Sequence, residues 1–185
     1  MPVEVHSERG PIMNQDPQGL ARSHDRYKVI PRVLCFIRHG DDVLLLRGAP
    51  DKRLWAGLYN GVGGHVECYE SIHTALLREV GEETGLTVRD VRLCGVVHAA
   101  GGDRAVGILF FVFTAWAAQR AVIATSEGAL EWIPTARLPP AEQMVEDLPW
   151  LLTKTLALGP ADPPFYAAYR YDDEGRLVVS GEGAI

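Results

Sequence analysis

Residues 64–86 read GHVECYESIHTALLREVGEETGL, and this stretch is more informative than any other part of the chain. Its apolar spacing predicts a helix over Glu70–Thr84, and Gly85 follows where a residue in the left-handed conformation commonly ends a helix. At about 3.6 residues per turn, one face of this helix is apolar and suited to packing on a core. The residues on that face are Ile72, Ala75 and Leu76.

Three glutamates, Glu79, Glu82 and Glu83, continue the apolar face toward the end of the helix. A charged face that only meets solvent should lie opposite the core stripe. Carboxylates are also disfavoured at a helix C-terminus, and at this spacing they repel one another by roughly a few tenths of a kcal/mol per pair. A divalent cation such as Mg2+ or Mn2+ would offset both costs. An exposed acidic helix end is the alternative, and these three residues alone do not decide between the two.

The loop before the helix contains Gly61, Gly63 and Gly64. Glycines let a backbone approach a ligand closely and expose its amides and carbonyls. A glycine-rich loop alone is weak evidence for a site. A glycine-rich loop that leads directly into a helix with clustered carboxylates is much less common and favours a ligand site.

The rest of the chain predicts an α+β fold, with a mixed sheet and helices packed against it. Segments rich in Val, Leu and Ile predict strands, Pro139-Pro140 predicts the start of a second helix, and an Asp-Asp-Glu-Gly turn predicts a final hairpin. We expect the nearly apolar strand 105–116 to be central. The predicted elements are strands 32–38 and 43–47 joined as a hairpin, strands 91–98, 105–116 and 131–134, a helix at about 141–158, and a tail hairpin at about 165–180.

The composition is that of a globular protein with a real core: 185 residues, 47% hydrophobic and 23% charged, with a net charge of -6. This charge argues against a general affinity for nucleic acid backbone. Three scattered cysteines and the absence of a signal pattern favour a cytoplasmic location without disulfides, and no apolar run is long enough to span a bilayer. We expect residues 1–26 to be a flexible arm and residues 27–185 to form one domain.

Residues 64–86 also resemble a known motif. It matches the box of the Nudix hydrolase family, G-x5-E-x7-R-E-U-x-E-E-x-G-U with U aliphatic, at every defined position. The matching residues are Gly64, Glu70, Arg78, Glu79, Val80, Glu82, Glu83, Gly85 and Leu86. The resemblance implies the Nudix α/β/α sandwich around a mixed sheet, and an enzyme that cuts a nucleoside diphosphate linked to another group.

The same resemblance implies roles for individual residues. Glu79 and Glu83, with the Gly63 carbonyl, would bind Mg2+, with Mn2+ as the other candidate. Glu82 would act directly or through water, as a further metal ligand or in catalysis. Arg78 would orient a glutamate through an ion pair. Glu70 and Gly85 would hold the motif together, Glu70 at the junction of loop and helix.

A narrower resemblance covers most of the chain from about Arg32 onward. Residues 59–67, YNGVGGHVE, are similar to the W-N-G-x-G-G pattern of animal-type 8-oxo-dGTP diphosphatases. The resemblance implies that Asn60 binds a purine base and that Gly64 also contacts the substrate. It implies the same for the acidic pair Glu146-Asp147. Glu127, five residues before a tryptophan, would supply another metal ligand.

The chain departs from this group at one position. The aromatic residue that stacks on the base falls at Met144 or Val145, so stacking would be lost or supplied by Trp55 or Tyr59. This puts 8-oxopurine selectivity in question but leaves the reaction class unchanged.

Three functions are therefore consistent with the sequence. The first is a diphosphatase that converts a normal or oxidised purine nucleoside triphosphate to the monophosphate and pyrophosphate. The second is a pyrophosphatase acting on ADP-ribose, dinucleoside polyphosphates or RNA 5′ ends, although the Asn60-Gly61 pattern disfavours ADP-ribose. The third is a sensing module without catalysis. We expect neither a DNA-binding domain nor a membrane partner, and both a monomer and a homodimer remain open.

Overall fold

The computed structural model describes residues 26–100 and 106–182, so that, apart from Arg26, the predicted N-terminal arm lies outside the described residues. The elements are β1 Lys28–His39, β2 Asp42–Gly48, β3 Tyr59–Asn60, α1 Ile72–Thr84, β4 Val88–Ala99, β5 Val106–Ala117, β6 Gly128–Pro134, α2 Leu148–Ala157, β7 Phe165–Tyr171 and β8 Leu177–Glu182. The longer connections along the chain are residues 49–58, 61–71, 118–127 and 135–147, and the last of these contains two short 3-10 turns.

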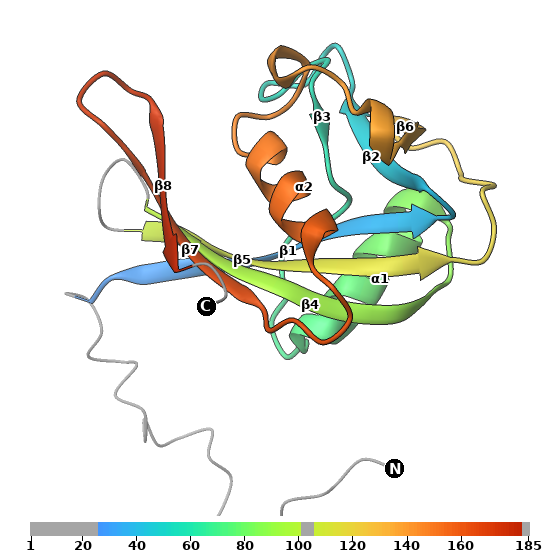
Figure 1. Cartoon of the computed structure of the whole chain (residues 1–185), viewed down its shortest axis with the longest axis horizontal. Helices are drawn as coiled ribbons and strands as arrows, with labels where there is room; N and C mark the ends of the chain where they lie inside the picture. Colours follow the sequence, from blue (N-terminus) through green and yellow to red (C-terminus); the bar gives the residue numbers. More distant parts are fainter. Residues whose placement is uncertain (1–25, 101–105, 183–185) are drawn as a thin grey trace, which may run out of the picture.

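The strands form one mixed, eight-stranded sheet in the order β3-β2-β1-β5-β4-β7-β8, with β6 paired to β2 (Figure 1). The pairs β1–β5 and β4–β7 are parallel, and the other pairs are antiparallel. Strand β5 lies between β1 and β4, which confirms the expectation that the most apolar strand is central.

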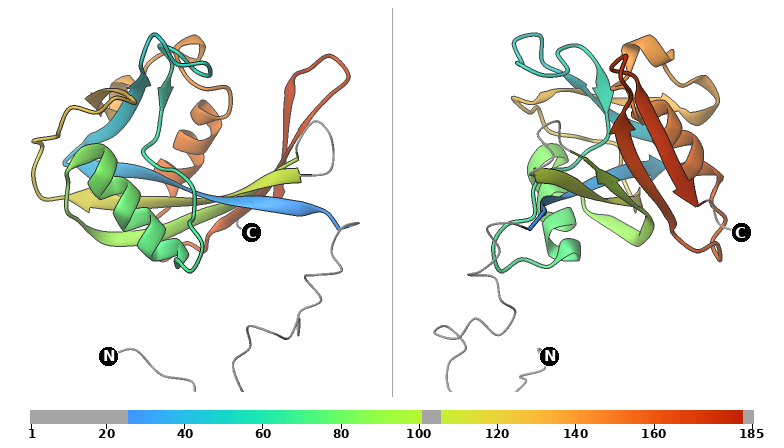
Figure 2. Two further views of the ribbon diagram at one scale, coloured as in Figure 1. Left: turned by 180° about the vertical axis from the view of Figure 1, so that it is seen from behind. Right: turned by 90° about the vertical axis from the view of Figure 1, so that its left-hand side faces the viewer.

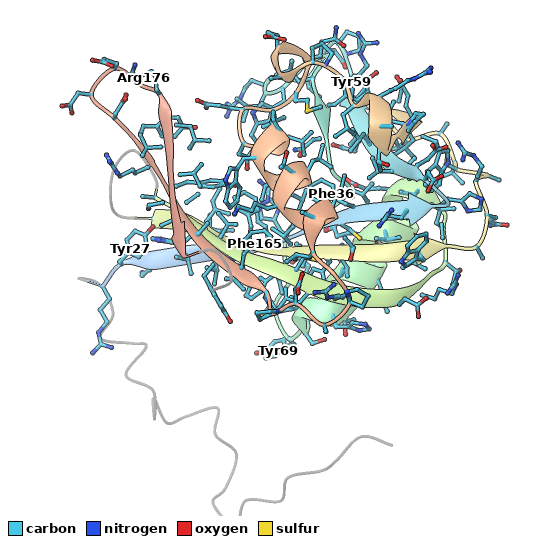
Figure 3. All side chains as sticks on the ribbon, in the orientation of Figure 1. Tyr27, Phe36, Tyr59, Tyr69, Phe165 and Arg176 are labelled. Carbon is cyan, nitrogen blue, oxygen red and sulfur yellow. The ribbon has the colours of Figure 1, made fainter. Side chains whose placement is uncertain are left out.

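The two α-helices lie on opposite faces of the sheet, as the views from the front and from behind show (Figures 1 and 2). Strand β1 serves both faces because successive side chains of a strand point to opposite sides. Val33, Cys35 and Ile37 pack with α1, whereas Leu34 and Phe36 pack with α2 (Figure 3 labels Phe36). This arrangement confirms the predicted α+β sandwich.

The first helix starts two residues later than predicted. Ser71 is its N-cap, and the Ser71 side chain accepts a hydrogen bond from the Thr74 amide at 3.1 Å. Glu70 therefore lies in the loop and not in the helix. Gly85 ends the helix in the left-handed conformation with φ +70°, and its amide donates to the Gly81 carbonyl, as its position in the motif predicts.

The predicted start of the second helix at residue 141 is wrong, because α2 begins at Leu148. Pro139-Pro140 opens only a short 3-10 turn, Ala141–Gln143. The residues that follow the turn pair with β3 and therefore do not continue as a helix. Met144 forms a β-bridge with Tyr59, and the Val145 amide donates to the Tyr59 carbonyl at 3.0 Å. Pro149 then fits only in a first helical turn, where its missing N–H costs nothing.

The tail forms the predicted hairpin from β7 and β8, which rises from one end of the sheet beside α2 (Figure 1). Phe165 packs into the same core as α2 (Figure 3), and β7 pairs in parallel with β4. This hairpin brings residues from the end of the chain next to the loop that precedes α2. None of the helices within residues 26–100 and 106–182 is long and apolar enough to cross a membrane.

Candidate active site

The first part of the site is a cavity of about 450 Å³, which we call the acidic cavity. Helix α1 contributes three carboxylates from its last two turns, and the loop before β6 contributes a fourth. The glycine loop and strand β1 form the rest of the wall. The residues that matter below are Glu79, Glu82, Glu83, Glu127, Gly63, Gly64 and Arg32.

Glu83 is a partly buried carboxylate of the acidic cavity. Burial raises the pKa of its carboxyl group to about 7, and the negative charges of Glu79 and Glu127 act in the same direction. Two contacts oppose this rise: the Gly63 amide donates a hydrogen bond to Glu83 Oε2 at 3.0 Å, and the positive charge of Lys52 lowers the pKa of Glu83. The glycine loop and the end of α1 are thus joined at a group whose charge the protein alone stabilises poorly.

Arg78 joins three glutamates of the motif. Its Nη1 donates to Glu79 Oε1 at 2.9 Å and to Glu82 Oε2 at 3.1 Å. Its other nitrogens donate to Glu70, and Nη2 also donates to the His65 carbonyl at 2.9 Å. These hydrogen bonds hold the pKa of Glu70 below its usual value. Arg78 therefore links the loop to two carboxylates of the acidic cavity.

The chemistry of this wall fits a divalent cation. Gly64 has no room for a side chain, since a Cβ would lie 2.4 Å from Glu79 Oε1. No residue in the described ranges donates a hydrogen bond to the Gly63 carbonyl, which leaves it free as a ligand. However, no three His, Cys, Asp or Glu side chains of the described residues are gathered into a ready-made metal site. Arg78 holds Glu79 and Glu82, and Lys52 pairs with Glu127, so a cation would have to draw these carboxylates inward.

A second cavity of about 460 Å³, which we call the apolar cavity, adjoins the first. Arg32 and Gly63 line both cavities, which places the acidic residues at one end of a continuous recess. Its walls come from β1, the glycine loop, the paired ends of β4 and β5, the residues before α2, and the tail hairpin. They include Trp55, Asn60, Phe110, Asp147, Tyr169 and Tyr171.

Two of the predicted substrate contacts, Asn60 and Asp147, both line this apolar cavity although 87 positions separate them in the sequence. Asn60 Oδ1 accepts a hydrogen bond from the Gly61 amide at 2.8 Å, which leaves the side-chain NH2 group to donate to a ligand. Burial raises the pKa of Asp147, and the neighbouring Glu146 adds to this shift. The wall therefore offers a fixed donor and a carboxyl group whose pKa lies above its ordinary value.

Tyr169 and Tyr171 line the apolar cavity, and the sequence analysis did not identify either of them. The hydroxyl of Tyr169 is buried and has no hydrogen-bond partner among the described residues. Burial raises the pKa of Tyr169, and the charge of Asp147 acts in the same direction. The alternation of the tail strand is the signal that was available, because period-two spacing puts residues 165, 167, 169 and 171 on one face.

Glu146, the other half of the acidic pair, lines the apolar cavity but is engaged by the tail hairpin. Its Oε2 accepts from the Tyr171 hydroxyl at 3.2 Å, and its Oε1 accepts from the Leu177 amide at 3.1 Å. These two bonds fasten the hairpin to the loop before α2. Gly64, the other expected substrate contact, faces the acidic cavity and is not part of the apolar cavity wall.

Of the two aromatic residues expected to replace the stacking ring, Trp55 lines the apolar cavity and Tyr59 does not. Met144 and Val145 are buried in the core. Tyr59 lines none of the cavities described above, because its hydroxyl donates to Glu131 and its ring lies under Arg47. The suggestion that Tyr59 stacks on a base is therefore wrong. Trp55 does line the apolar cavity, is 45% exposed, and adopts an unusual positive φ of 61°.

Comparison with known proteins identifies a family. The model of the NUDIX domain family matches residues 28–153. Among curated proteins, the NAD-capped RNA hydrolase NudC of Pasteurella multocida is 34% identical over 95 residues, which is 51% of this chain and 34% of that protein. NudC of Pseudomonas entomophila is 36% identical over 93 residues, 50% of this chain and 31% of that protein. The chain thus spans about a third of the length of these relatives.

Among solved structures, the MutT protein of Bacillus halodurans superimposes with a TM-score of 0.69 at 25% identity, covering 83% of this chain and 97% of that one. The NUDIX domain of Shewanella oneidensis NrtR, solved with ADP ribose, shares the fold with a TM-score of 0.55 at 20% identity, covering 77% of this chain and 92% of that one. Together with the match of the family model to most of the described residues, these likenesses show that the chain belongs to the Nudix domain family.

Proposed function

We propose that this protein is a Mg2+-dependent pyrophosphohydrolase, with Mn2+ as an alternative ion, that converts a normal or oxidised purine nucleoside triphosphate to the monophosphate and pyrophosphate. The observation that carries the proposal is the adjacency of the two cavities. An apolar recess with polar groups suited to a base opens directly beside a wall of five glutamates, which are Glu67, Glu79, Glu82, Glu83 and Glu127, and Gly63 belongs to both.

In this proposal, each end of the recess has its own task. The base lies in the apolar cavity, where the Asn60 NH2 group donates to an acceptor on its edge and Asp147 completes the pairing. Trp55, Tyr171 and Phe110 supply apolar surface that excludes water from the base. A pocket that hydrogen-bonds its ligand discriminates strongly, because an ill-fitting base leaves buried polar groups unpaired.

The acidic cavity receives the phosphates. Glu79, Glu83, Glu127 and the Gly63 carbonyl hold the metal, which supplies Lewis-acid polarisation of the phosphoryl oxygens. Glu82 is exposed and lies at the solvent side of the wall, where it contacts the attacking water directly or through a second water. Water adds to phosphorus, the anhydride P–O bond breaks, and the proton released by the water passes to a carboxylate or to solvent. Arg78 keeps Glu79 and Glu82 oriented throughout.

A second candidate is a pyrophosphatase for a larger dinucleotide, including an NAD-type RNA 5′ end. Two curated relatives are named NAD-capped RNA hydrolase, and their similarity covers half of this chain. We favour the first candidate because Asn60 and Asp147 line the same apolar cavity and offer an NH2 donor and a carboxyl group to the edge of one base. A sensing module without catalysis is less well supported, because all glutamates of the motif are present.

One screen separates the candidates. The protein is incubated with Mg2+ and each of 8-oxo-dGTP, dGTP, dCTP, ADP-ribose and NAD-capped RNA, and the phosphate products are resolved by chromatography. The proposal expects pyrophosphate and a monophosphate, with the highest kcat/KM for a purine triphosphate. A higher kcat/KM for ADP-ribose or capped RNA would establish the second candidate, and no turnover of any compound would leave the sensing module.

A further inference from the structure

Among the residues that the structure describes, Arg32 is the one charged side chain that borders all three cavities of the recess. It lines the acidic cavity, the apolar cavity, and a smaller cavity of about 90 Å³ bounded by Lys52, Glu83 and Glu127. It comes from the middle of β1 and has no place in the sequence motif. A group at this junction faces the point where a ligand passes from the base-binding end to the acidic end.

The backbone at Arg32 is held on both sides. Its strand pairs in parallel with β5 opposite Phe110, and the glycine loop bridges to it from the other side through His65. The next residue, Val33, donates to the Gly64 carbonyl at 2.9 Å. The side chain therefore projects from a rigid support, which limits the conformational entropy that binding a ligand would cost.

The guanidinium group itself has no fixed partner. Within residues 26–100 and 106–182 it forms no hydrogen bond and no ion pair, although it is half-buried. Desolvation lowers the pKa of Arg32, and the charges of Glu79 and Glu83 oppose that shift, so the group stays cationic. A half-buried cation with its donors unused is suited to an anion, and a guanidinium matches the oxygens of a phosphate in a two-pronged geometry.

We propose that Arg32 binds the phosphate adjacent to the nucleoside and so fixes the direction in which the substrate lies, base toward the tail hairpin and outer phosphates toward α1. This inference rests on the proposed function for the site but not on the identity of the base. A role as counter-ion to Glu79 and Glu83 is the competing explanation. That role predicts ion pairs in the metal-free protein, and the guanidinium forms none with either residue.

The test compares ligands that differ only in phosphate. Dissociation constants are measured by calorimetry in Mg2+ for a nucleoside, its monophosphate and its α,β-imido triphosphate, none of which is hydrolysed between the first two phosphates. Two series are run, one with 8-oxo-deoxyguanosine and one with adenosine. In wild type the affinity should rise from nucleoside to monophosphate. In Arg32→Gln this rise should fall by about tenfold to a hundredfold, as expected for lost hydrogen bonds to a charged group, while nucleoside affinity stays within about twofold.

Arg38→Gln is the matched control, because Arg38 lies in the same strand, packs over Trp116 and lines none of the three cavities. It should leave both series unchanged. The melting temperature of each variant, with and without Mg2+, confirms folding and metal binding. Equal loss of nucleoside and monophosphate affinity in Arg32→Gln, or no loss of either, overturns the inference. A phosphate-dependent loss in the adenosine series alone would keep the inference and refute the oxidised-purine substrate.

Discussion

Glu70 and Arg78 lie eight positions apart and are joined by two parallel hydrogen bonds: Arg78 Nε to Glu70 Oε1 at 3.0 Å, and Nη2 to Oε2 at 3.1 Å. Glu70 also accepts a hydrogen bond from the Glu67 amide at 3.1 Å. The pair connects the loop that carries the motif's glycines to the helix that carries its glutamates. The remaining nitrogen of Arg78 is then aimed at Glu79 and Glu82.

Replacing Arg78 by lysine should keep the charge and lose this geometry. A lysine ammonium cannot span Glu70, Glu79 and Glu82 from one planar group. We expect a lower melting temperature and roughly a tenfold to hundredfold lower kcat/KM, the range found when the partners that orient metal ligands are changed. Arg89→Lys is the control, because Arg89 is exposed and pairs only with Asp90 next to it. Unchanged kinetics in Arg78→Lys would show that the glutamates hold their positions unaided.

Glu83→Gln should separate activity from stability. We expect kcat to fall by at least about a hundredfold, because metal ions contribute several kcal/mol of transition-state stabilisation. The metal-free variant should be as stable as wild type or more stable, since glutamine still accepts from the Gly63 amide and removes a half-buried charge. Glu142→Gln, on an exposed 3-10 turn, is the control. Near-normal turnover would exclude Glu83 as a metal ligand, and a large loss of stability would assign it a structural partner instead.

Mg2+ or Mn2+ should stabilise the folded protein. The acidic cavity gathers five carboxylates in the folded state only, so a cation bound there shifts the equilibrium between folded and unfolded protein by mass action. At about a hundredfold excess over the dissociation constant the gain is about 2.7 kcal/mol. Thermal unfolding with EDTA, Mg2+ and an equal ionic strength of NaCl measures it. A shift that NaCl reproduces, or that survives in a Glu79→Gln/Glu83→Gln double variant, would place the cation elsewhere.

Asn60→Ala and Asp147→Ala should erode the choice of base more than metal binding. Each removes one polar group that faces the apolar cavity, and an unpaired polar group on a buried base costs about 1–3 kcal/mol. We expect the kcat/KM ratio of 8-oxo-dGTP to dGTP, and of purine to pyrimidine triphosphates, to shrink by roughly fivefold or more. The Mg2+-induced shift in melting temperature should stay unchanged. If neither variant alters the ranking of 8-oxo-dGTP, dGTP, dCTP and ADP-ribose, the assignment of this cavity to the base is wrong.

Asp147 should also make stability depend on pH. Its folded-state pKa lies above the ordinary value of 3.8, so the folded protein holds the proton more tightly than the unfolded chain. The resulting stabilisation is complete below the ordinary value and is lost as the pH rises through the raised value. Asp147→Asn, which is neutral throughout, should therefore flatten this decline and be the more stable protein at neutral pH. Unfolding curves of both proteins between about pH 4 and pH 8 measure the difference, and parallel pH profiles would contradict the raised pKa of Asp147.

The amino-acid sequence by itself determined the parts of this protein whose residues are neighbours along the chain. The helix at Ile72–Thr84, its Gly85 cap and its line of glutamates follow from local periodicity, because a helix repeats every few residues. The same holds for the central β5 strand, which was expected from its nearly apolar run of residues. It holds also for the tail hairpin, whose alternation and turn residues are local signals. The start of α2 was not determined in this way, since the backbone of Met144 and Val145 pairs with Tyr59, about 85 positions earlier.

Only the tertiary structure decided what surrounds the glutamates. Arg32 from β1, Asn60 from β3, Asp147 before α2 and Tyr169 from β7 line one recess because parallel pairing of β1 with β5 and of β4 with β7 draws distant segments together. The resemblance pointed to Asn60 and Asp147, but no local pattern marks Arg32, and the alternation of β7 indicates only the face on which Tyr169 lies. Tyr59 shows that sequence neighbours do not fix the direction of a side chain. Its position next to Asn60 suggested a contact with the base, but its ring packs under Arg47 and its hydroxyl donates to Glu131, away from the recess. Side-chain direction depends on what the rest of the chain packs around it, and that information exists only in the folded molecule.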